Sequence, residues 1–156
     1  MAFLHTRPTP VTHANLKTSN LLVTSGHRVK VADIGGLLEA DLSKNSTLAA
    51  LHNPQYIAPE ILRGGHLGEA SDTYAFGVIC WELLTWQRPW AGKSAWEIVR
   101  AVTGSGDLPV PADGALPGPD RPPKAQLEKY KNLMRQCYGK GEFGRPSFKE
   151  IVSVLE

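Results

Sequence analysis

Cysteine is scarce in this sequence, and the two cysteines that occur lie far apart. Cys80 and Cys137 stand in separate apolar segments, without a C-x-x-C pair and without a histidine at ligand spacing. Disulfide-rich secreted domains and zinc modules use cysteines in closely spaced sets. We therefore expect two buried free thiols in an intracellular protein, and neither a disulfide scaffold nor a zinc site.

An excess of charge of one sign and a long hydrophobic run are also missing. The 156 residues carry 17 Lys and Arg against 15 Asp and Glu, a formal net charge of +2. So small an excess does not favour a nucleic-acid backbone as partner. No stretch approaches about 18 apolar residues, and the first residues lack a signal-peptide pattern. The sequence predicts a cytoplasmic protein without nucleic-acid or membrane partners.

The hydrophobic pattern predicts one mainly α-helical domain with a short β-hairpin. Residues 21–24 and 29–31 are rich in β-branched and aliphatic side chains and flank a turn, which predicts the hairpin. The longest apolar segment follows Ser71 and Asp72, which we expect to cap a central helix starting at Thr73. A second helix is predicted over 95–102, capped by Ser94, and a last one from Pro146 to residue 155.

A further helix is predicted around residues 127–138, with apolar residues repeating at three and four positions. Basic side chains fill the predicted opposite face, and we interpret that face as solvated rather than as a membrane-binding surface: Lys124, Lys129, Lys131 and Arg135. Between positions 104 and 123 the chain holds four glycines and six prolines, which excludes regular structure and predicts a loop or a boundary.

Several short motifs occur in one order along the chain. Residues 13–20 read His-Ala-Asn-Leu-Lys-Thr-Ser-Asn, and Asp33-Ile34-Gly35 follows the predicted hairpin. Ala58-Pro59-Glu60, an Asp72-to-Gly77 segment and a Gly-Arg-Pro sequence around Arg145 come later. This series resembles the C-terminal lobe of protein kinases, whose motifs are H-R-D-L-K-x-x-N, D-F-G and A-P-E. The closing segment is similar to that of tyrosine-kinase-like serine/threonine kinases.

The resemblance implies a protein-kinase-like C-lobe over residues 1–156. Its catalytic loop would be residues 13–20, its activation segment 33–60 and its helical core 71–156. A Gly-rich phosphate loop, a Val-Ala-x-Lys strand and a helix with the partner glutamate are not found in this sequence. We therefore expect the nucleotide-covering N-lobe to be absent from this chain, or to belong to a longer parent chain.

By the same resemblance, Asn20 and Asp33 are the expected Mg²⁺ ligands, because both offer hard oxygen donors. Lys17 is the expected catalytic lysine, which meets the transferring phosphate, and it would bind ATP together with those two residues. With only half an adenine pocket, we expect this chain to bind Mg²⁺-ATP no tighter than roughly millimolar.

The sequence departs from the family at the catalytic position itself. Asn15 stands where the family has the aspartate that orients the substrate hydroxyl, and a carboxamide takes no proton at neutral pH. Asn53 stands where serine/threonine kinases usually have a threonine that bonds this aspartate. We expect Asn15 and Asn53 to pair through their amides, so that the contact is kept while the chemistry is lost.

Three further residues have structural roles in the family. Asp72 is expected to accept backbone N–H groups of the catalytic loop rather than only to favour its own helix dipole. Glu60 and Arg145 are expected to form a buried bidentate ion pair with N–O distances of about 2.7–3.2 Å. The alternative leaves Arg145 as a solvated residue before a helix.

The functional expectation is a signalling protein of the kinase family, ancestrally catalysing ATP-dependent phosphorylation of protein Ser or Thr. Because of Asn15 and the missing lobe, we expect this chain itself to be inactive. The alternative is a pseudokinase that serves as a scaffold or protein-binding module. Either hypothesis implies a protein substrate or partner.

Overall fold

The structure, a computed structural model, describes residues 1–35, 52–104, 108, 123–139 and 141–156. In these ranges the chain is mainly α-helical with one two-stranded antiparallel sheet, which confirms the predicted fold class. The predicted loop at 104–123 and the middle of the proposed activation segment lie almost wholly outside the described residues.

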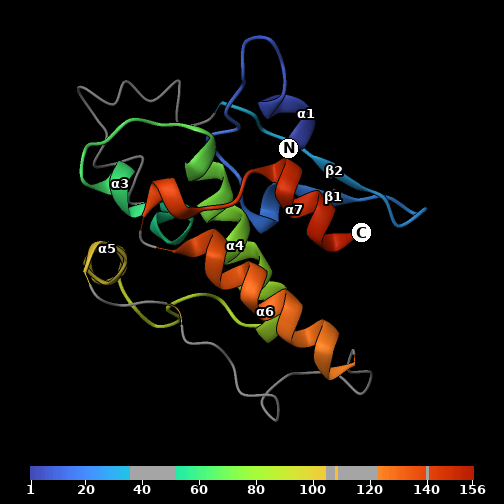
Figure 1. Ribbon diagram of the computed structural model, residues 1–156. Coiled ribbons are helices and arrows are strands. Elements are labelled where there is room, and N and C mark those ends of the chain that lie inside the picture. The colour runs from blue at the N-terminus through green and yellow to red at the C-terminus, as the bar shows by residue number, and fades with distance from the viewer. Residues whose placement is uncertain (36–51, 105–107, 109–122, 140) are drawn as a thin grey trace.

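Two long helices form the centre of the fold (Figure 1). Helix α4, Glu69–Thr85, is buried on nearly every side, and α6, Lys124–Tyr138, lies along it. The two helices approach closely at Gly77, where a Cβ atom would lie only 2.7 Å from the backbone nitrogen of Tyr138. A residue without a side chain is therefore required at this crossing.

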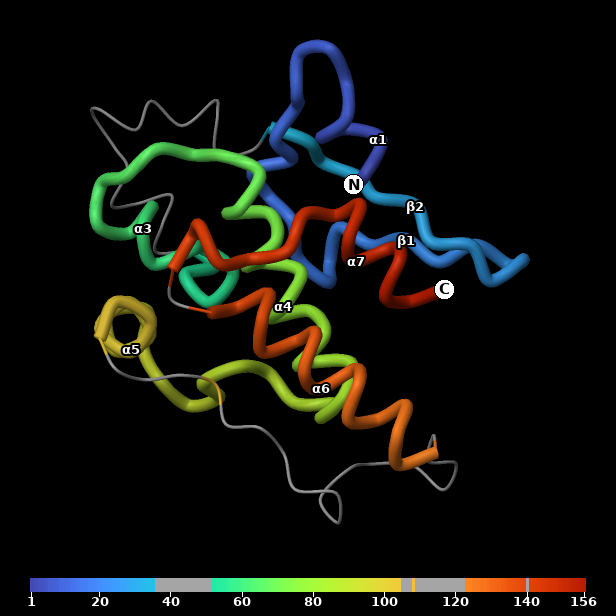
Figure 2. The backbone as a smooth tube through the Cα atoms, in the orientation of Figure 1, coloured from blue at the N-terminus to red at the C-terminus, as the bar shows by residue number. Residues whose placement is uncertain are grey.

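The remaining elements surround this pair (Figure 2). The short helix α1, Ala2–His5, contacts α7, Phe148–Leu155. The 3₁₀ turn η2, Pro54–Tyr56, lies against α4, and both η2 and α3, Pro59–Leu62, contact α5, Ala95–Thr103. The η2 contacts place the segment after position 52 on α4, and hydrogen bonds from the backbone of His13 and Ala14 to Asp72 place the loop before position 20 on the same helix.

Strands β1, Leu21–Val23, and β2, Val29–Val31, form the predicted hairpin. Leu21 pairs with Val31, and Val23 with Val29. The hairpin extends away from the helices (Figure 1), and its apolar side chains are largely exposed. It contributes little to the core.

Two of the predicted helix starts are wrong by a few residues. Helix α4 begins at Glu69 rather than Thr73, after Gly68, so Asp72 lies inside its first turn, where the carboxylate accepts N–H groups of a distant loop instead of capping the helix. Helix α7 begins at Phe148, and Ser147, not Pro146, is its cap, in a capping box with Glu150. The predicted Ser94 cap is confirmed by the same type of box at the start of α5.

One residue of the predicted basic face of α6 is in fact buried. Lys131 is 3% exposed, and its Nζ lies 3.4 Å from Glu128. Position 131 falls four residues after Leu127 and three before Met134, both of which are buried, so it shares their face of the helix. The other three basic residues of that face are exposed, as predicted: Lys124, Lys129 and Arg135.

Both cysteines are free and buried, as the sequence predicted. No described helix has the length and apolar character needed to cross a bilayer.

Candidate functional site

One buried carboxylate, that of Asp72, accepts hydrogen bonds from the backbone of the loop at residues 13–20. Asp72, in the first turns of α4, is 2% exposed. Its Oδ2 accepts the backbone N–H of His13 at 2.7 Å, and its Oδ1 accepts that of Ala14 at 2.9 Å. His5 Nε2 also lies 2.9 Å from Oδ2. The prediction that Asp72 accepts backbone N–H groups of this loop is confirmed.

The loop has an unusual backbone where Asp72 holds it. Ala14 has φ of 64°, the left-handed region, which costs a non-glycine residue free energy. Two neighbouring N–H groups thereby point at one carboxylate. Beside Ala14, burial lowers the pKa of His13, and its Nδ1 accepts the Asn15 backbone N–H at 3.2 Å. A neutral ring is required for that contact, because a protonated Nδ1 could not accept.

The side chains of Asn15, Asn20 and Asp33 form one hydrogen-bonded cluster next to this loop. The Asn15 side-chain Nδ2 donates to Asp33 Oδ2 at 2.6 Å. Asn20 Nδ2 donates to the Asn15 carbonyl at 2.8 Å and lies 3.4 Å from the same Asp33 oxygen. Backbone bonds from Ala32 to Asn20 and from Gly35 to His13 fix the chain on both sides of Asp33.

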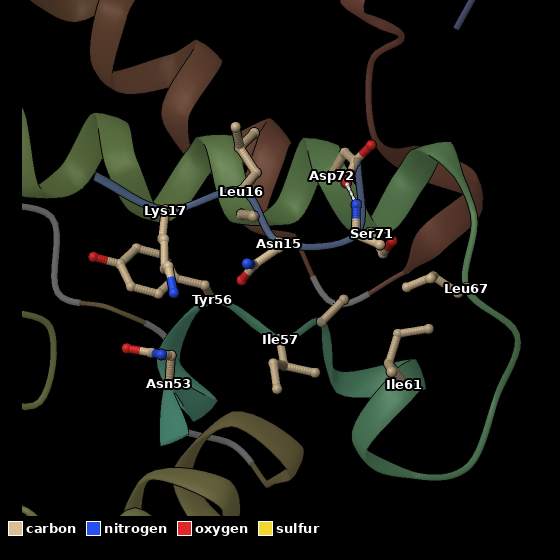
Figure 3. Close-up of a pocket in the computed structure, with 13 residues that line it drawn as sticks. Asn15, Leu16, Lys17, Asn53, Tyr56, Ile57, Ile61, Leu67, Ser71 and Asp72 are labelled. Carbon is tan, nitrogen blue, oxygen red and sulfur yellow. Dashed lines mark hydrogen bonds between the residues drawn. The ribbon is translucent and has the colours of Figure 1, made fainter. Parts of the chain in front are cut away.

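The predicted amide pair between Asn15 and Asn53 is wrong. No hydrogen bond joins these two side chains, both of which the structure describes. Asn15 turns to Asp33 because an ionised carboxylate is a stronger acceptor for an amide N–H than a neutral amide oxygen. Asn53 instead lines the pocket beside Asn15 and Lys17 (Figure 3).

The donor atoms of Asn20 and Asp33 fit a magnesium ion. The Asn20 amide is oriented by its N–H contacts, which leaves its oxygen without a donor among the described residues. At Asp33 both amide contacts fall on Oδ2 and none on Oδ1. A carboxylate oxygen and an amide oxygen, each available, are the hard ligands that Mg²⁺ prefers.

A pocket of about 50 Å³ adjoins Asn15 (Figure 3). Asn15, Lys17 and Asn53 supply polar side chains to its wall, while the rest is mainly apolar and comes from the segment after position 56 and from α4: Ile57, Ala58, Ile61, Leu67 and Ala75.

Tyr56 links three elements around this pocket. Its hydroxyl donates to Glu82 of α4 at 2.7 Å and lies 2.9 Å from the Thr18 hydroxyl in the loop. Burial, with help from the Glu82 contact, raises the pKa of Tyr56, so the phenol stays protonated and donates. Burial also raises the pKa of Glu82, and the Tyr56 bond opposes that rise. Sequence reasoning missed this link, since no local pattern marks residues 26 positions apart.

The predicted ion pair closes the base of the structure. Arg145 Nη1 and Nη2 lie 2.5 Å and 2.9 Å from the two oxygens of Glu60, a bidentate contact between residues 85 positions apart. Arg145 also donates to the carbonyls of Ala70 and Gly139 and lies over the Tyr74 ring. The Arg145 side chain has no exposed area and that of Glu60 is 16% exposed, so the predicted largely buried, bidentate pair is confirmed and the solvated alternative is excluded. One of the two distances, 2.5 Å, is shorter than the predicted range.

Curated relatives are similar to this chain over almost its whole length. The serine/threonine-protein kinase CTR1 of Arabidopsis thaliana is 45% identical over 156 residues, which cover 99% of this chain and 18% of that protein. The probable serine/threonine-protein kinase drkD of Dictyostelium discoideum is 36% identical over 100% of this chain and 11% of its own length. The dual specificity protein kinase shkC of Dictyostelium discoideum is 34% identical over 99% of this chain and 29% of its length.

The chain thus spans under a third of the length of each of these relatives. A family model described as "Protein tyrosine and serine/threonine kinase" matches residues 1–155. Together with the arrangement of the loop at 13–20, Asp33, Asp72 and the Glu60–Arg145 pair, this match shows that the chain belongs to the protein tyrosine and serine/threonine kinase family.

Proposed function

We propose that residues 1–156 form the C-lobe of a protein kinase that acts on Ser or Thr of a protein substrate, and that this lobe transfers phosphate poorly because of Asn15. The observation that carries the proposal is the Asn15–Asn20–Asp33 cluster, held by Asp72 next to Lys17 and the pocket. Serine/threonine kinases among the relatives support the reaction class.

The proposed chemistry depends on positioning and charge rather than on covalent catalysis. Asn20 and Asp33 would hold Mg²⁺, which supplies charge neutralisation at the phosphates of ATP when bound. Lys17, half-buried beside the pocket, places a further positive charge where a phosphate would approach. The buried Asp72 holds the backbone of the loop that carries Asn15, Lys17 and Asn20, and the backbone bonds from Ala32 and Gly35 join the Asp33 segment to that loop.

This arrangement lacks a catalytic base, because Asn15 occupies the position of one. In this chain its amide offers two N–H donors and one neutral oxygen, and it cannot accept the proton of a substrate hydroxyl at neutral pH. A general base is commonly worth about 10²–10⁴ in rate. We therefore propose transfer that is slower than in relatives by a factor of this order, with metal and phosphate contacts retained.

A chimera tests the proposal. Residues 1–156 replace the matching segment in the kinase domain of the Arabidopsis relative, which supplies the nucleotide-covering lobe, and ³²P transfer from ATP to a protein substrate is measured. Asn15→Asp should raise transfer at least about tenfold, and Lys17→Ala in that background should remove the gain.

The matched control is Asn53→Asp, which adds the same charge to the same pocket without reaching Asp33. A chimera that binds nucleotide but transfers no phosphate with Asp at position 15 would contradict the proposal. Equal gains from both substitutions would show that charge alone, not the catalytic position, limits transfer.

A second proposal is a pseudokinase that binds a protein partner without modifying it. One observation favours it: the Asn15 amide bond to Asp33 assembles the loop with no catalytic base in place. The pocket beside Asn15 would then receive a partner's side chain. Partner or peptide binding that is unchanged by Asp33→Asn, which removes a proposed metal ligand outside the pocket lining, together with no transfer after Asn15→Asp, would distinguish this function from the first.

A further inference from the structure

We propose that the Asn15 amide acts as an internal substitute for a divalent cation at Asp33, holding this carboxylate in position while competing with a metal ion for it. Asn15 is then a positioning residue for the metal ligand, beyond its failure to act as a base. The inference deepens the proposed function and rests on its assignment of Asp33 as a metal ligand.

The contact between Asn15 and Asp33 is a hydrogen bond from an amide N–H to a carboxylate oxygen. Asp33 follows β2 in a solvent-exposed position, and its φ of 64° lies in the left-handed region. An ionised carboxylate only accepts hydrogen bonds, so the Asn15 atom at 2.6 Å from Oδ2 must be the amide nitrogen. Asn20 directs its own amide nitrogen at the same oxygen from 3.4 Å. The partial positive charges of two amides thus converge on one carboxylate oxygen.

Replacing Asn15 by aspartate would reverse the sign of this contact. An oxygen would take the place of the donating nitrogen, and two carboxylates would face each other at about the present 2.6 Å. Like charges this close destabilise the ionised pair unless a cation lies between or beside them. With aspartate at position 15 the cluster therefore needs a cation, and with asparagine it assembles without one.

Competition follows from the same contact. A metal ion that takes Asp33 as a ligand draws electron density from the carboxylate that now receives the Asn15 N–H. Removing the Asn15 amide without adding charge, as in Asn15→Ala, leaves Oδ2 with the longer Asn20 contact of 3.4 Å and should tighten metal binding. Adding a carboxylate, as in Asn15→Asp, should tighten it further, because a second negatively charged carboxylate then faces the ion beside that of Asp33.

The test uses Mn²⁺ as a spectroscopic probe in place of Mg²⁺, with free Mn²⁺ counted by electron paramagnetic resonance during titration of the 156-residue chain. Relative to the parent, Asn15→Ala should lower the Mn²⁺ dissociation constant about threefold and Asn15→Asp at least tenfold. Asp33→Asn gives the background from other carboxylates. No nucleotide and no phosphate transfer enter the measurement, so failure of the proposed kinase activity leaves it interpretable.

Asn53→Ala and Asn53→Asp are the matched controls, since Asn53 lines the same pocket but makes no bond to Asp33. Both should leave the dissociation constant within about twofold of the parent. An Asn15→Ala variant that binds Mn²⁺ no tighter than the parent would overturn the proposal, as would equal gains from Asn15→Asp and Asn53→Asp. Should Asn15→Asp fold only when Mg²⁺ is present, the proposal is supported; should it fail to fold in either condition, the two alanine variants decide.

Discussion

The base of the lobe around Arg145 and the β1–β2 hairpin are built in opposite ways. Arg145 has no exposed side-chain area, and its hydrogen bonds reach a carboxylate and two backbone carbonyls. In the hairpin, Leu22, Val23 and Val29 are each more than half exposed. Helix α3, which carries Glu60, and the hairpin lie on different sides of α4 (Figure 1).

This difference shows where the candidate site takes its rigidity from. The site loop joins α4 through Asp72 and leads directly into β1 at Leu21. On the α4 side the charged groups Asp72 and Arg145 are buried and have hydrogen-bond partners. The hairpin side has two short strands and few buried atoms. The site geometry should therefore respond to changes in the helical base and tolerate changes in the hairpin.

Arg145→Ala should have the largest effect on stability. The substitution leaves Glu60, 16% exposed at its side chain, without its bidentate partner, and breaking a buried ion pair typically costs about 3–5 kcal/mol. Urea unfolding followed by circular dichroism measures the free energy. The control is Arg135→Ala, whose exposed side chain donates to Asn132. A loss of under 1 kcal/mol for Arg145→Ala would contradict the claim that the buried ion pair stabilises the fold more than the exposed hairpin does.

Gly77→Ala should come next, with a loss of about 2 kcal/mol. The added Cβ would lie 2.7 Å from the Tyr138 backbone nitrogen and 2.8 Å from Cys137 Cβ, so α4 and α6 would have to separate. Overpacking of this kind costs about 1–3 kcal/mol. Gly141→Ala, where nothing lies within 4 Å of the new Cβ, should change the free energy of unfolding by no more than about 0.5 kcal/mol. Equal losses at both glycines would contradict the close crossing.

The sequence predicted the two central helices, but it did not predict the start of α4 or the burial of Lys131. Apolar periodicity was sufficient for α4 and α6, because a helix that is apolar on nearly all sides must be central. The start of α4 was missed because Asp72 resembles a local cap, while its carboxylate is used by a loop 58 and 59 positions away. Lys131 was misplaced because a lysine in a helix is usually exposed, although its spacing from Leu127 indicated the buried face.

The Glu60–Arg145 contact and the Asp72 contacts were implied by the resemblance to the kinase family and are confirmed. The partner of Asn15 was not, because the choice between Asn53 and Asp33 depends on side-chain directions and on the charge of the acceptor. The Thr18–Tyr56–Glu82 link carried no signal, since each residue is ordinary in its own segment. Long-range polar contacts of this kind follow from packing rather than from local pattern.

Alkaline pH should weaken the buried α4–α6 region. Burial raises the pKa of Cys80 to about 11 and that of Cys137 to about 12, from an ordinary value of 9.0. Above pH 9 the unfolded chain therefore loses these protons first, and the free energy of unfolding falls as pH rises toward 11. We expect a loss of about 1 kcal/mol per thiol between pH 9 and 10.

Urea unfolding at pH 7, 9 and 10 measures this fall. Replacing Cys80 by alanine should remove about half of the thiol contribution to the slope, at a constant cost that is already present at pH 7. In the folded parent at pH 8, both thiols should resist iodoacetamide, because the thiolate is the reactive form. Rapid alkylation without denaturant would show that the α4–α6 contact opens readily.

The smallest effect should come from Val29→Thr, and the same substitution at Val78 makes it informative. Val29 is 59% exposed in β2, where threonine is as suitable for a strand as valine, so the free energy of unfolding should change by less than about 0.5 kcal/mol. Val78 is fully buried in α4, and its threonine would bring a hydroxyl into the core at a cost of about 1–2 kcal/mol. Because the chemical change is identical, the difference between the two losses in urea unfolding reports mainly on the burial of the two side chains. Equal losses would mean that the hairpin is as well packed as the central helix, and the contrast between the two regions would fail.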